Sequence, residues 1–226
     1  MGLPIAVLLS GSGSNLQAII DRIEQGSLNT SINLVLSNNP EAYGLERAKQ
    51  HGLPTWVMPH GDYASREEYD REVVSAIKEA GAEVVVLAGF MRLLSAEFVR
   101  AFPNKILNIH PALLPSFLGL HGQKQAHDYG VAISGATVHF VDEKLDHGPI
   151  IIQAAVPARQ DDDEDTLAKR ILNLEHRIYP QAIEWLCNQR LSLEGRKVKL
   201  QEAGKKLADL GAVQPCLINP ALEEGF

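Results

Sequence analysis

Short apolar runs rich in β-branched residues alternate with amphipathic stretches along the first hundred residues. Between the runs, the spacing of apolar positions predicts helices that begin near Asn15, Glu41 and Arg66. Strands and helices that alternate in this way form right-handed βαβ units around a parallel sheet buried on both faces. The predicted strands are residues 5–9, 32–37, 55–58 and 84–90.

The pattern changes after Ile106. Residues 134–141 alternate apolar and polar positions, and residues 149–156 form a second apolar run after a short loop, which predicts neighbouring antiparallel strands. The fold class we expect is α/β: one domain with a Rossmann-like, doubly wound, mostly parallel sheet and late antiparallel strands.

An acidic run, residues 161–165, precedes apolar residues spaced four, three and four apart up to Ile178. We expect a helix whose positive N-terminal end is next to these acids, and a solvated face rather than a metal site. Pro180 should kink or divide this helix. The segment 191–226 is charged and without a clear pattern, apart from an indicated strand at 197–200, so we expect a loosely attached tail.

Composition narrows the class of protein. The 226 residues are 45% hydrophobic and 22% charged, enough for one large core. With 21 Lys and Arg against 28 Asp and Glu, the net charge of −7 argues against broad binding to nucleic acid or to a membrane surface. The N-terminal stretch has no basic region of a leader, and the two cysteines, Cys187 and Cys216, form no framework, so we expect a reduced, cytoplasmic protein. Nothing in the sequence indicates the oligomeric state.

The first candidate site is the sequence SGSGSN, residues 10–15, between the first strand and the first helix. Glycines that permit a tight turn, amides at a helix N-terminus and short polar side chains suit phosphate oxygens. The dinucleotide fingerprint would need glycine where Leu16 stands, and no P-loop lysine follows, so NAD is disfavoured. A plain turn capped by Ser14 or Asn15 is the structural alternative.

The second candidate is the pair Asn108 and His110, two residues apart at the end of an apolar run. Their side chains should point to the same side of a strand, at the edge where α/β sheets bind ligands. An amide N–H and an imidazolium suit the oxyanion of an acyl-transfer intermediate. A capping asparagine and an interior histidine explain the same residues structurally, and this alternative stays open.

The third candidate is Asp146, in the loop between the two late strands. A carboxylate brought near His110 would favour the imidazolium and raise the pKa of His110, whereas a turn aspartate is the structural alternative. A zinc site is a further alternative, because His110, His121, His139, His147 and Asp146 are available. They lack the spacing of zinc motifs, so we expect no metal.

Five segments together resemble the glycinamide ribonucleotide transformylase family, the folate-dependent formyltransferases of purine biosynthesis. In chain order they are SGSGSNLQAII at residue 10, VVVLAGFMRLLS at 84, ILNIHPALLPSF at 106, GATVHFVDEKLDHGPII at 135 and EHRIYP at 175. The resemblance covers about residues 4–190. It implies a catalytic domain over 1–190, with a phosphate-binding half of about 1–100 and a folate and catalytic half of about 101–190, ahead of the tail at 191–226.

The resemblance also implies roles for individual residues. Transfer of a formyl group from 10-formyltetrahydrofolate to the amine of 5-phosphoribosylglycinamide would give formylglycinamide ribonucleotide and tetrahydrofolate, by direct amine attack. Asn108 and protonated His110 would stabilise the oxyanion, and Asp146 would keep His110 charged. The resemblance assigns ribonucleotide contacts to Gly13, Ser14, Asn15 and Glu175, and folate contacts to Arg66, Met91, Arg92, Leu93, Leu94 and Asn108.

Some positions depart from the family pattern, and other functions remain open. Ala112, Leu118 and His147 differ from the residues we expect around the catalytic loop. A methionyl-tRNA formyltransferase would need a larger, basic domain in place of the 36 residues after 190, and a formyltetrahydrofolate hydrolase would need a regulatory domain before the first strand. A hydrolase-like enzyme and a non-catalytic nucleotide- or folate-binding module stay as alternatives.

Overall fold

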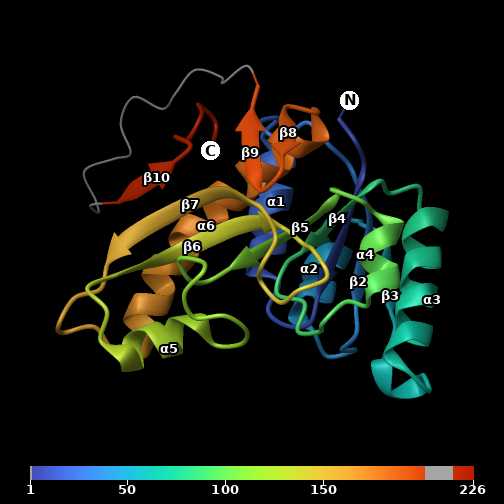
Figure 1. The fold of residues 1–226 in the computed structure, drawn as a ribbon. Coiled ribbons are helices and arrows are strands. Elements are labelled where there is room, and N and C mark those ends of the chain that lie inside the picture. Colours follow the sequence, from blue (N-terminus) through green and yellow to red (C-terminus); the bar gives the residue numbers. More distant parts are fainter. Residues whose placement is uncertain (1, 202–215) are drawn as a thin grey trace.

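The central feature is a mixed β-sheet (Figure 1). The computed structural model describes residues 2–201 and 216–226, and within these ranges eight strands form one sheet in the order β10-β7-β6-β5-β4-β1-β2-β3. Neighbouring strands from β5 to β3 pair parallel, whereas β6, β7 and β10 pair antiparallel. The expected fold class is thereby confirmed. The strands are β1 Ile5–Leu9, β2 Ile32–Ser37, β3 Thr55–Val57, β4 Val84–Leu87, β5 Ile106–His110, β6 Ile133–Phe140, β7 Ile150–Pro157 and β10 Leu217–Asn219.

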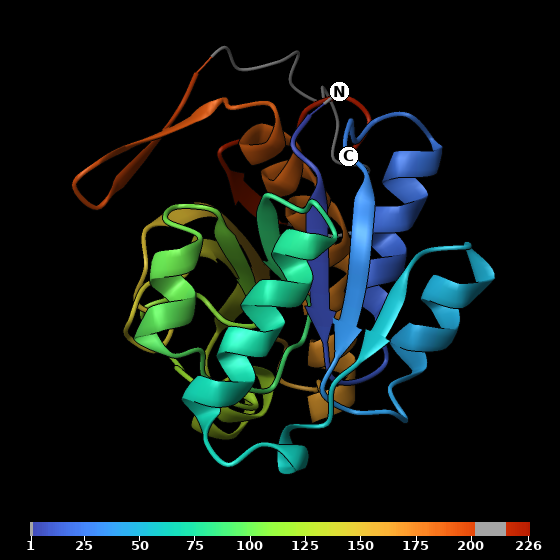
Figure 2. The same ribbon diagram turned by 90° about the vertical axis from the view of Figure 1, so that its right-hand side faces the viewer.

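Helices cover both faces of the sheet, as Figure 2 shows: α3 and α4 lie on the near face and α6 lies behind it. Helices α1, α2 and α6 share one apolar core with the sheet, and α3 and α4 share a second core with its other face. The helices expected near Asn15, Glu41 and Arg66 are α1, α2 and α3. The bounds are α1 Ser14–Glu24, α2 Tyr43–Gln50, α3 Arg66–Glu79, α4 Ala96–Ala101, α5 Gly122–Tyr129 and α6 Glu164–Cys187, with a 3₁₀ turn η1 at His60–Asp62.

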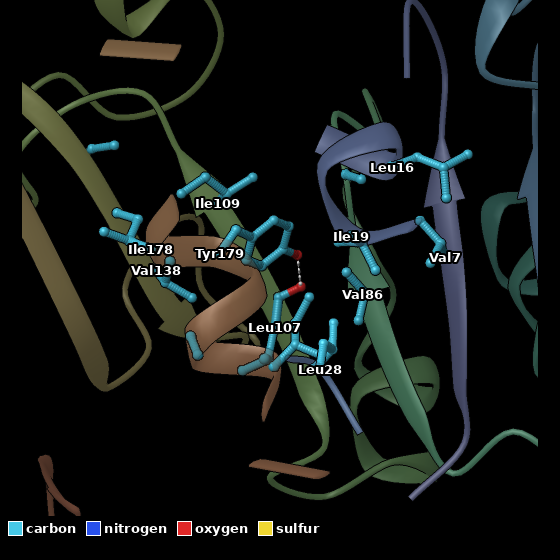
Figure 3. Packing of buried hydrophobic residues seen from close by; sticks show 14 of the residues in the cluster. Val7, Leu16, Ile19, Leu28, Val86, Leu107, Ile109, Val138, Ile178 and Tyr179 are labelled. Carbon is cyan, nitrogen blue, oxygen red and sulfur yellow. Dashed lines mark hydrogen bonds between the residues drawn. The ribbon is translucent and has the colours of Figure 1, made fainter. Parts of the chain in front are cut away.

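The two cores follow from the two-residue period of the strands. Leu107 and Ile109 of β5 lie in the core beneath α1 and α6 (Figure 3). There the buried hydroxyl of Tyr179 lies 2.9 Å from the carbonyl oxygen of Leu87 and 3.0 Å from that of Leu107, bridging β4 and β5. Because successive side chains alternate, Asn108 and His110 belong to the opposite face of the sheet.

The parallel part of the sheet reverses its winding beside β1, which pairs with β2 on one side and with β4 on the other. Ligands in open α/β sheets bind at such switch points, beyond the carboxyl ends of the strands. The loops that follow β1 and β4 are joined here, because Ser10 N donates to Gly89 O at 3.0 Å and Met91 N donates to Ser10 Oγ at 2.9 Å.

The acidic run does begin a helix. The Asp163 side chain caps α6 by accepting from Thr166 N at 2.8 Å, and Asp162 accepts from the Arg170 guanidinium at 2.6 Å. Of the two effects expected at Pro180, division of the helix is wrong, because α6 continues through it to Cys187, and a kink stays a prediction. Pro180 cannot donate to the carbonyl four residues earlier, but it is buried with most of its neighbours in α6, and we attribute the continuity of the helix to this packing.

The segment after residue 190 contains more structure than its composition indicates. Strands β8, Leu191–Glu194, and β9, Lys197–Leu200, form a hairpin that projects beyond α6 in Figure 2, and β9 coincides with the expected strand. Residues 216–226, expected in a loose tail, add β10 to the edge of the sheet and bury Phe226 in the core. No helix within the described residues is long and apolar enough to cross a membrane.

Candidate active site

Three predicted residues meet beyond the end of β5. Asn108 and His110 leave this strand on the same face, and the β6–β7 loop brings Asp146 to them. His110 Nδ1 lies 3.5 Å from Asp146 Oδ2, and both side chains are less than a tenth exposed. The predicted approach of Asp146 to His110 is therefore present, and Asn108 is linked to them through His139, whose Nε2 lies 3.2 Å from Asn108 Nδ2 and 3.8 Å from Asp146 Oδ1.

The contacts of His110 place a hydrogen-bond acceptor beside each nitrogen of its ring. Its Nε2 lies 2.7 Å from the carbonyl oxygen of Phe117, which can only accept, so Nε2 carries a hydrogen. Nδ1 faces a carboxylate oxygen of Asp146, which is also an acceptor. Both neighbours of the ring can therefore accept a hydrogen bond from it.

His139 is a part of this cluster that the sequence reasoning missed. It lies opposite Asn108 in the antiparallel pairing of β5 and β6, and its Nε2 is 3.2 Å from Asn108 Nδ2. The His139 Nδ1–H donates to Phe140 O at 2.8 Å, so a neutral ring has Nε2 free to accept from the Asn108 amide. Burial lowers the pKa of His139, and this favours the neutral ring although Asp146 opposes the shift.

This hydrogen bond fixes which way the Asn108 amide points. One N–H of Nδ2 is directed to His139, so the nitrogen rather than the oxygen is on that side. The second N–H of the same nitrogen is left for another acceptor. The signal in the sequence was the alternation of residues 134–141, which places His139 on the same face as Asn108 once the strand register is known.

Asp146 is held in a constrained loop. Its φ of +46° lies in the left-handed region that is uncommon for residues other than glycine, and its Oδ2 accepts from Gly119 N at 2.7 Å. Two residues on, an added Cβ at Gly148 would meet Phe140 O at 1.8 Å, so only glycine permits this backbone approach. The loop geometry therefore sets where the carboxylate lies.

The loop after β5 closes over His110. Phe117 and His121 have φ values of +55° and +60°, and Gly119 between them has +81°, so the chain turns tightly back toward the strand end. The turn aims the Phe117 carbonyl at His110 and the Gly119 amide at Asp146. Of the family departures noted above, Ala112 is buried and Leu118 is 45% exposed.

A second group of predicted residues lies at the start of α1. Gly13 is the N-cap with φ +68°, and the cap makes no side-chain hydrogen bond, so neither Ser14 nor Asn15 caps the helix. An added Cβ at Gly13 would lie 2.4 Å from Gly44 Cα, which shows how closely this turn approaches α2. The first-turn amides of α1 therefore have no side-chain cap.

Asn15 connects α1 to α6. Its Nδ2 donates to Glu175 Oε2 at 2.8 Å, across 160 positions of sequence, while its Oδ1 is buried and has no hydrogen-bond partner among the described residues. Glu175 is 4% exposed, and burial raises the pKa of its carboxyl although the bond from Asn15 opposes the shift. A buried carboxylate with one neutral donor is suited to a further hydroxyl donor.

Beside this pair, a cavity of about 370 Å³ opens between α1, α2 and α6. Ser14 lines it, together with the guanidinium groups of Arg22, Arg47 and Arg177 and one carboxylate, that of Asp21. Three cationic groups against one anionic group, next to a helix N-terminus, favour an anion here. The sequence reasoning missed these arginines, because they come from three separate helices.

The remaining predicted residues are spread over two places. Met91 and Leu93 are 63% and 56% exposed after β4, Leu94 packs against the second core, and Arg92 lies 4.6 Å from the centroid of the Tyr69 ring. Arg66 begins α3, where it contacts Glu67 at 3.2 Å. None of these residues contacts Asn108, His110 or Asp146 through a described hydrogen bond or ion pair. In residues 2–201 and 216–226, no three His, Cys, Asp or Glu side chains are arranged to hold a metal ion.

Comparison with known proteins places the chain among formyl transferases. Residues 3–183 match the formyl transferase family. The phosphoribosylglycinamide formyltransferase of Escherichia coli is 47% identical over 189 residues, which cover 84% of this chain and 89% of that protein. The structure of glycinamide ribonucleotide transformylase 1 from Symbiobacterium toebii superimposes with a TM-score of 0.87 at 46% identity, covering 89% of this chain and 95% of that one.

Longer relatives contain the same domain. The trifunctional purine biosynthetic protein adenosine-3 of Drosophila melanogaster is 52% identical over 186 residues, and the match spans 81% of this chain but only 14% of that protein. The match with the bacterial enzyme covers nearly all of that protein, and the resemblance seen in the five sequence segments is confirmed. The chain belongs to the phosphoribosylglycinamide formyltransferase family of formyl transferases.

Proposed function

We propose that the protein transfers the formyl group of 10-formyltetrahydrofolate to the amine of 5-phosphoribosylglycinamide in de novo purine biosynthesis. The products are formylglycinamide ribonucleotide and tetrahydrofolate. The observation that carries this proposal is the convergence of Asn108, His110 and Asp146 at the end of β5, in a chain of this family. The residue roles follow from the donors that each side chain presents.

The reaction starts with attack of the neutral amine on the formyl carbon. A new C–N bond forms, the formyl oxygen takes up negative charge, and the Asn108 amide and the His110 imidazolium donate to this oxygen. The attacking nitrogen then loses a proton, the bond from carbon to the folate nitrogen breaks, and that nitrogen leaves with a proton. His110 and water are the groups suited to carry the proton, and no covalent enzyme intermediate is needed.

Binding of the donor must replace one contact of His110. The Nε2–H that would serve the oxyanion donates to the Phe117 carbonyl at 2.7 Å. A formyl oxygen that takes the place of this carbonyl finds a donor already oriented, because Nδ1 faces Asp146 at 3.5 Å. Asp146 also favours the charged imidazole, so the donor remains cationic.

The ribonucleotide fits the second group of residues. Its phosphate suits the first turn of α1 at Gly13, Ser14 and Asn15, beside the arginines of the 370 Å³ cavity. A ribose hydroxyl can donate to the buried carboxylate of Glu175, and the Asn15 Oδ1 that has no partner can accept from another donor. In this proposal the glycinamide amine extends from these contacts toward the end of β5.

The proposed folate site rests more on the family resemblance than the proposed ribonucleotide site does. Exposed Met91 and Leu93 offer apolar surface to a flat ring at the end of β4, next to the loop joined to Ser10. The adjoining Arg92 and Leu94 belong to the same segment, and Asn108 is the group closest to the transferred carbon in this arrangement. Arg66, on the first turn of α3, is proposed as a folate contact from the resemblance.

The test is an assay of the purified full chain with 10-formyltetrahydrofolate, with and without the ribonucleotide, following tetrahydrofolate release. We expect release that requires the ribonucleotide, and His110→Ala should lower kcat about a hundred- to a thousandfold. His127→Ala, which removes a partly exposed histidine on α5, is the matched control and should keep normal turnover.

Other outcomes point to the alternatives. Release without ribonucleotide would indicate a hydrolase, and no release from folded protein would indicate a binding module. A folded His110→Ala variant with normal turnover would exclude the proposed role of His110.

A further inference from the structure

The β8–β9 hairpin contacts the loop that carries Asp146. Arg196, at the tip of the hairpin, donates through Nη2 to the backbone carbonyl of His147 at 2.6 Å. His147 is the residue directly after Asp146 in the chain. A group from residues outside the family match at 3–183 therefore holds the backbone beside the proposed catalytic carboxylate.

The His147 side chain completes this contact. Its Nδ1 lies 2.7 Å from Asp142 Oδ2, and Arg196 Nη1 lies 3.3 Å from both ring nitrogens. Since the carboxylate can only accept, Nδ1 carries the hydrogen, and Nε2 of a neutral ring can accept from Arg196. Asp142 Oδ1 accepts in turn from Lys144 N at 2.9 Å.

The loop from Asp142 to Gly148 is thus anchored at several points. Asp142 fixes its start, and the Gly148 backbone is pressed against Phe140 O at its end. Between them Asp146 has a φ of +46°, a conformation that the surroundings must maintain. Arg196 supplies a contact on the outer side of this segment, one residue away from the strained position.

The hairpin is itself firmly attached at its base. Arg190, where α6 gives way to β8, contacts Glu184 at 3.0 Å and Glu223 at 2.7 Å. The last described segment, which contains Glu223, accordingly braces the base of the hairpin. The hairpin that carries Arg196 is therefore fixed at its base to α6, the helix that also contains Glu175.

We propose that Arg196 is a positioning residue for formyl transfer, acting through the backbone of His147 to keep the Asp146 carboxylate in place beside His110. The inference deepens the proposed function and rests on it for the role of Asp146. Arg196 does not contact the reacting atoms, so its effect should appear in the rate of the chemical step rather than in ribonucleotide binding.

The experiment compares Arg196→Ala, Arg196→Lys and Lys197→Ala in the full chain. Lys197 is exposed on the same hairpin, so its variant removes the same charge without touching the loop. We expect Arg196→Ala to lower kcat about three- to tenfold with little change in KM for the ribonucleotide, as for loss of one partly exposed charged hydrogen bond. Arg196→Lys should recover part of the rate, and Lys197→Ala should match the unaltered protein.

A double variant tests whether Arg196 acts through the Asp146 carboxylate. Asp146→Asn alone should lower kcat more than Arg196→Ala does. Adding Arg196→Ala to Asp146→Asn should lower kcat no further, because the group that Arg196 positions is already neutral. An equal additional loss in this background, or equal kcat for Arg196→Ala and Lys197→Ala, would overturn the inference.

Hydrogen exchange at residues 142–148 separates the inference from the proposed function. Faster exchange in Arg196→Ala than in Lys197→Ala is expected, and equal exchange would overturn the contact as a restraint. Near-normal turnover of Asp146→Asn would instead refute the role given to Asp146 in the proposed function, and the exchange result would still decide whether Arg196 holds the loop.

Discussion

Replacing Asn108 by aspartate changes one NH₂ group into an oxygen and tests two contacts at once. The Asn108 amide donates to His139 Nε2 at 3.2 Å, and its second N–H is the proposed donor to the oxyanion. The new carboxylate can donate to neither. It also places a negative charge next to the oxygen that becomes negative during the reaction.

The two losses have separate magnitudes. Loss of an oxyanion donor lowers the rate about a hundred- to a thousandfold, or about 3–4 kcal/mol, and charge repulsion adds to it. Loss of the bond to buried His139 leaves its Nε2 facing an acceptor, which should lower the free energy of unfolding by about 1–3 kcal/mol at pH 8. Asn29→Asp, the same change at an exposed position, is the control for both measurements.

The pH dependence gives the sharper test. In the unaltered protein, burial lowers the pKa of His139, so the unfolded chain binds its proton more readily and this residue's contribution to stability falls as pH falls. The new carboxylate would favour protonated His139 in the folded variant, and the stability gap between the two proteins should therefore narrow from pH 8 to pH 6.

Urea unfolding at the two pH values and kcat from tetrahydrofolate release measure these effects. A gap that does not change with pH would refute the hydrogen bond from Asn108 to His139. Turnover of Asn108→Asp within tenfold of normal would refute the oxyanion role of Asn108.

Three further predictions follow from single contacts. Glu175→Gln keeps an acceptor for Asn15 and removes a buried carboxyl group whose pKa is raised by burial, so Tm should stay the same or rise. The Kd for the ribonucleotide, measured by titration, should increase about tenfold, and an unchanged Kd would contradict the proposed contact. Gly13→Ala places a Cβ at 2.4 Å from backbone at φ +68°, and it should lower the free energy of unfolding by more than about 1 kcal/mol and weaken ribonucleotide binding, whereas a neutral result would refute the close approach. The Arg170 guanidinium lowers the pKa of Asp162 to about 2, so Asp162→Asn should lower the free energy of unfolding by about 1–2 kcal/mol above pH 4. Urea unfolding should show that this difference disappears toward pH 2.

The elements were predictable where the local pattern decides the structure. The parallel strands and the antiparallel pair follow from runs of apolar residues, and the period of two was enough to place Asn108 and His110 on one face. Pro180 shows the opposite case. Its local effect predicts a break, but its burial in the core outweighs the lost hydrogen bond, and this burial depends on partners far away in sequence.

Contacts between residues far apart in sequence could not be predicted from the local pattern, even where the residues themselves were named. Asn15 and Glu175 are 160 positions apart, and His139 contacts Asn108 only because of the register between β5 and β6. The end of the chain carries little apolar periodicity of its own. It is ordered by pairing of β10 with β7 and by ion pairs such as Arg190 with Glu223, which composition alone does not reveal.

The site therefore combines residues from both faces of the sheet. Glu175 belongs to a helix that packs on one face, whereas Asn108 and His110 belong to the other, so the proposed binding residues come from separate elements of the fold. The loops that follow β1 and β4 lie at the same edge of the sheet, where Ser10 joins them through Gly89 and Met91. In the proposed function, an amine held on the α1–α6 side would reach a formyl carbon held on the β5 side across that edge. If the proposed function holds, the parallel order β5-β4-β1 is what would let the two substrates meet, and the side chains at the strand ends would supply the chemistry.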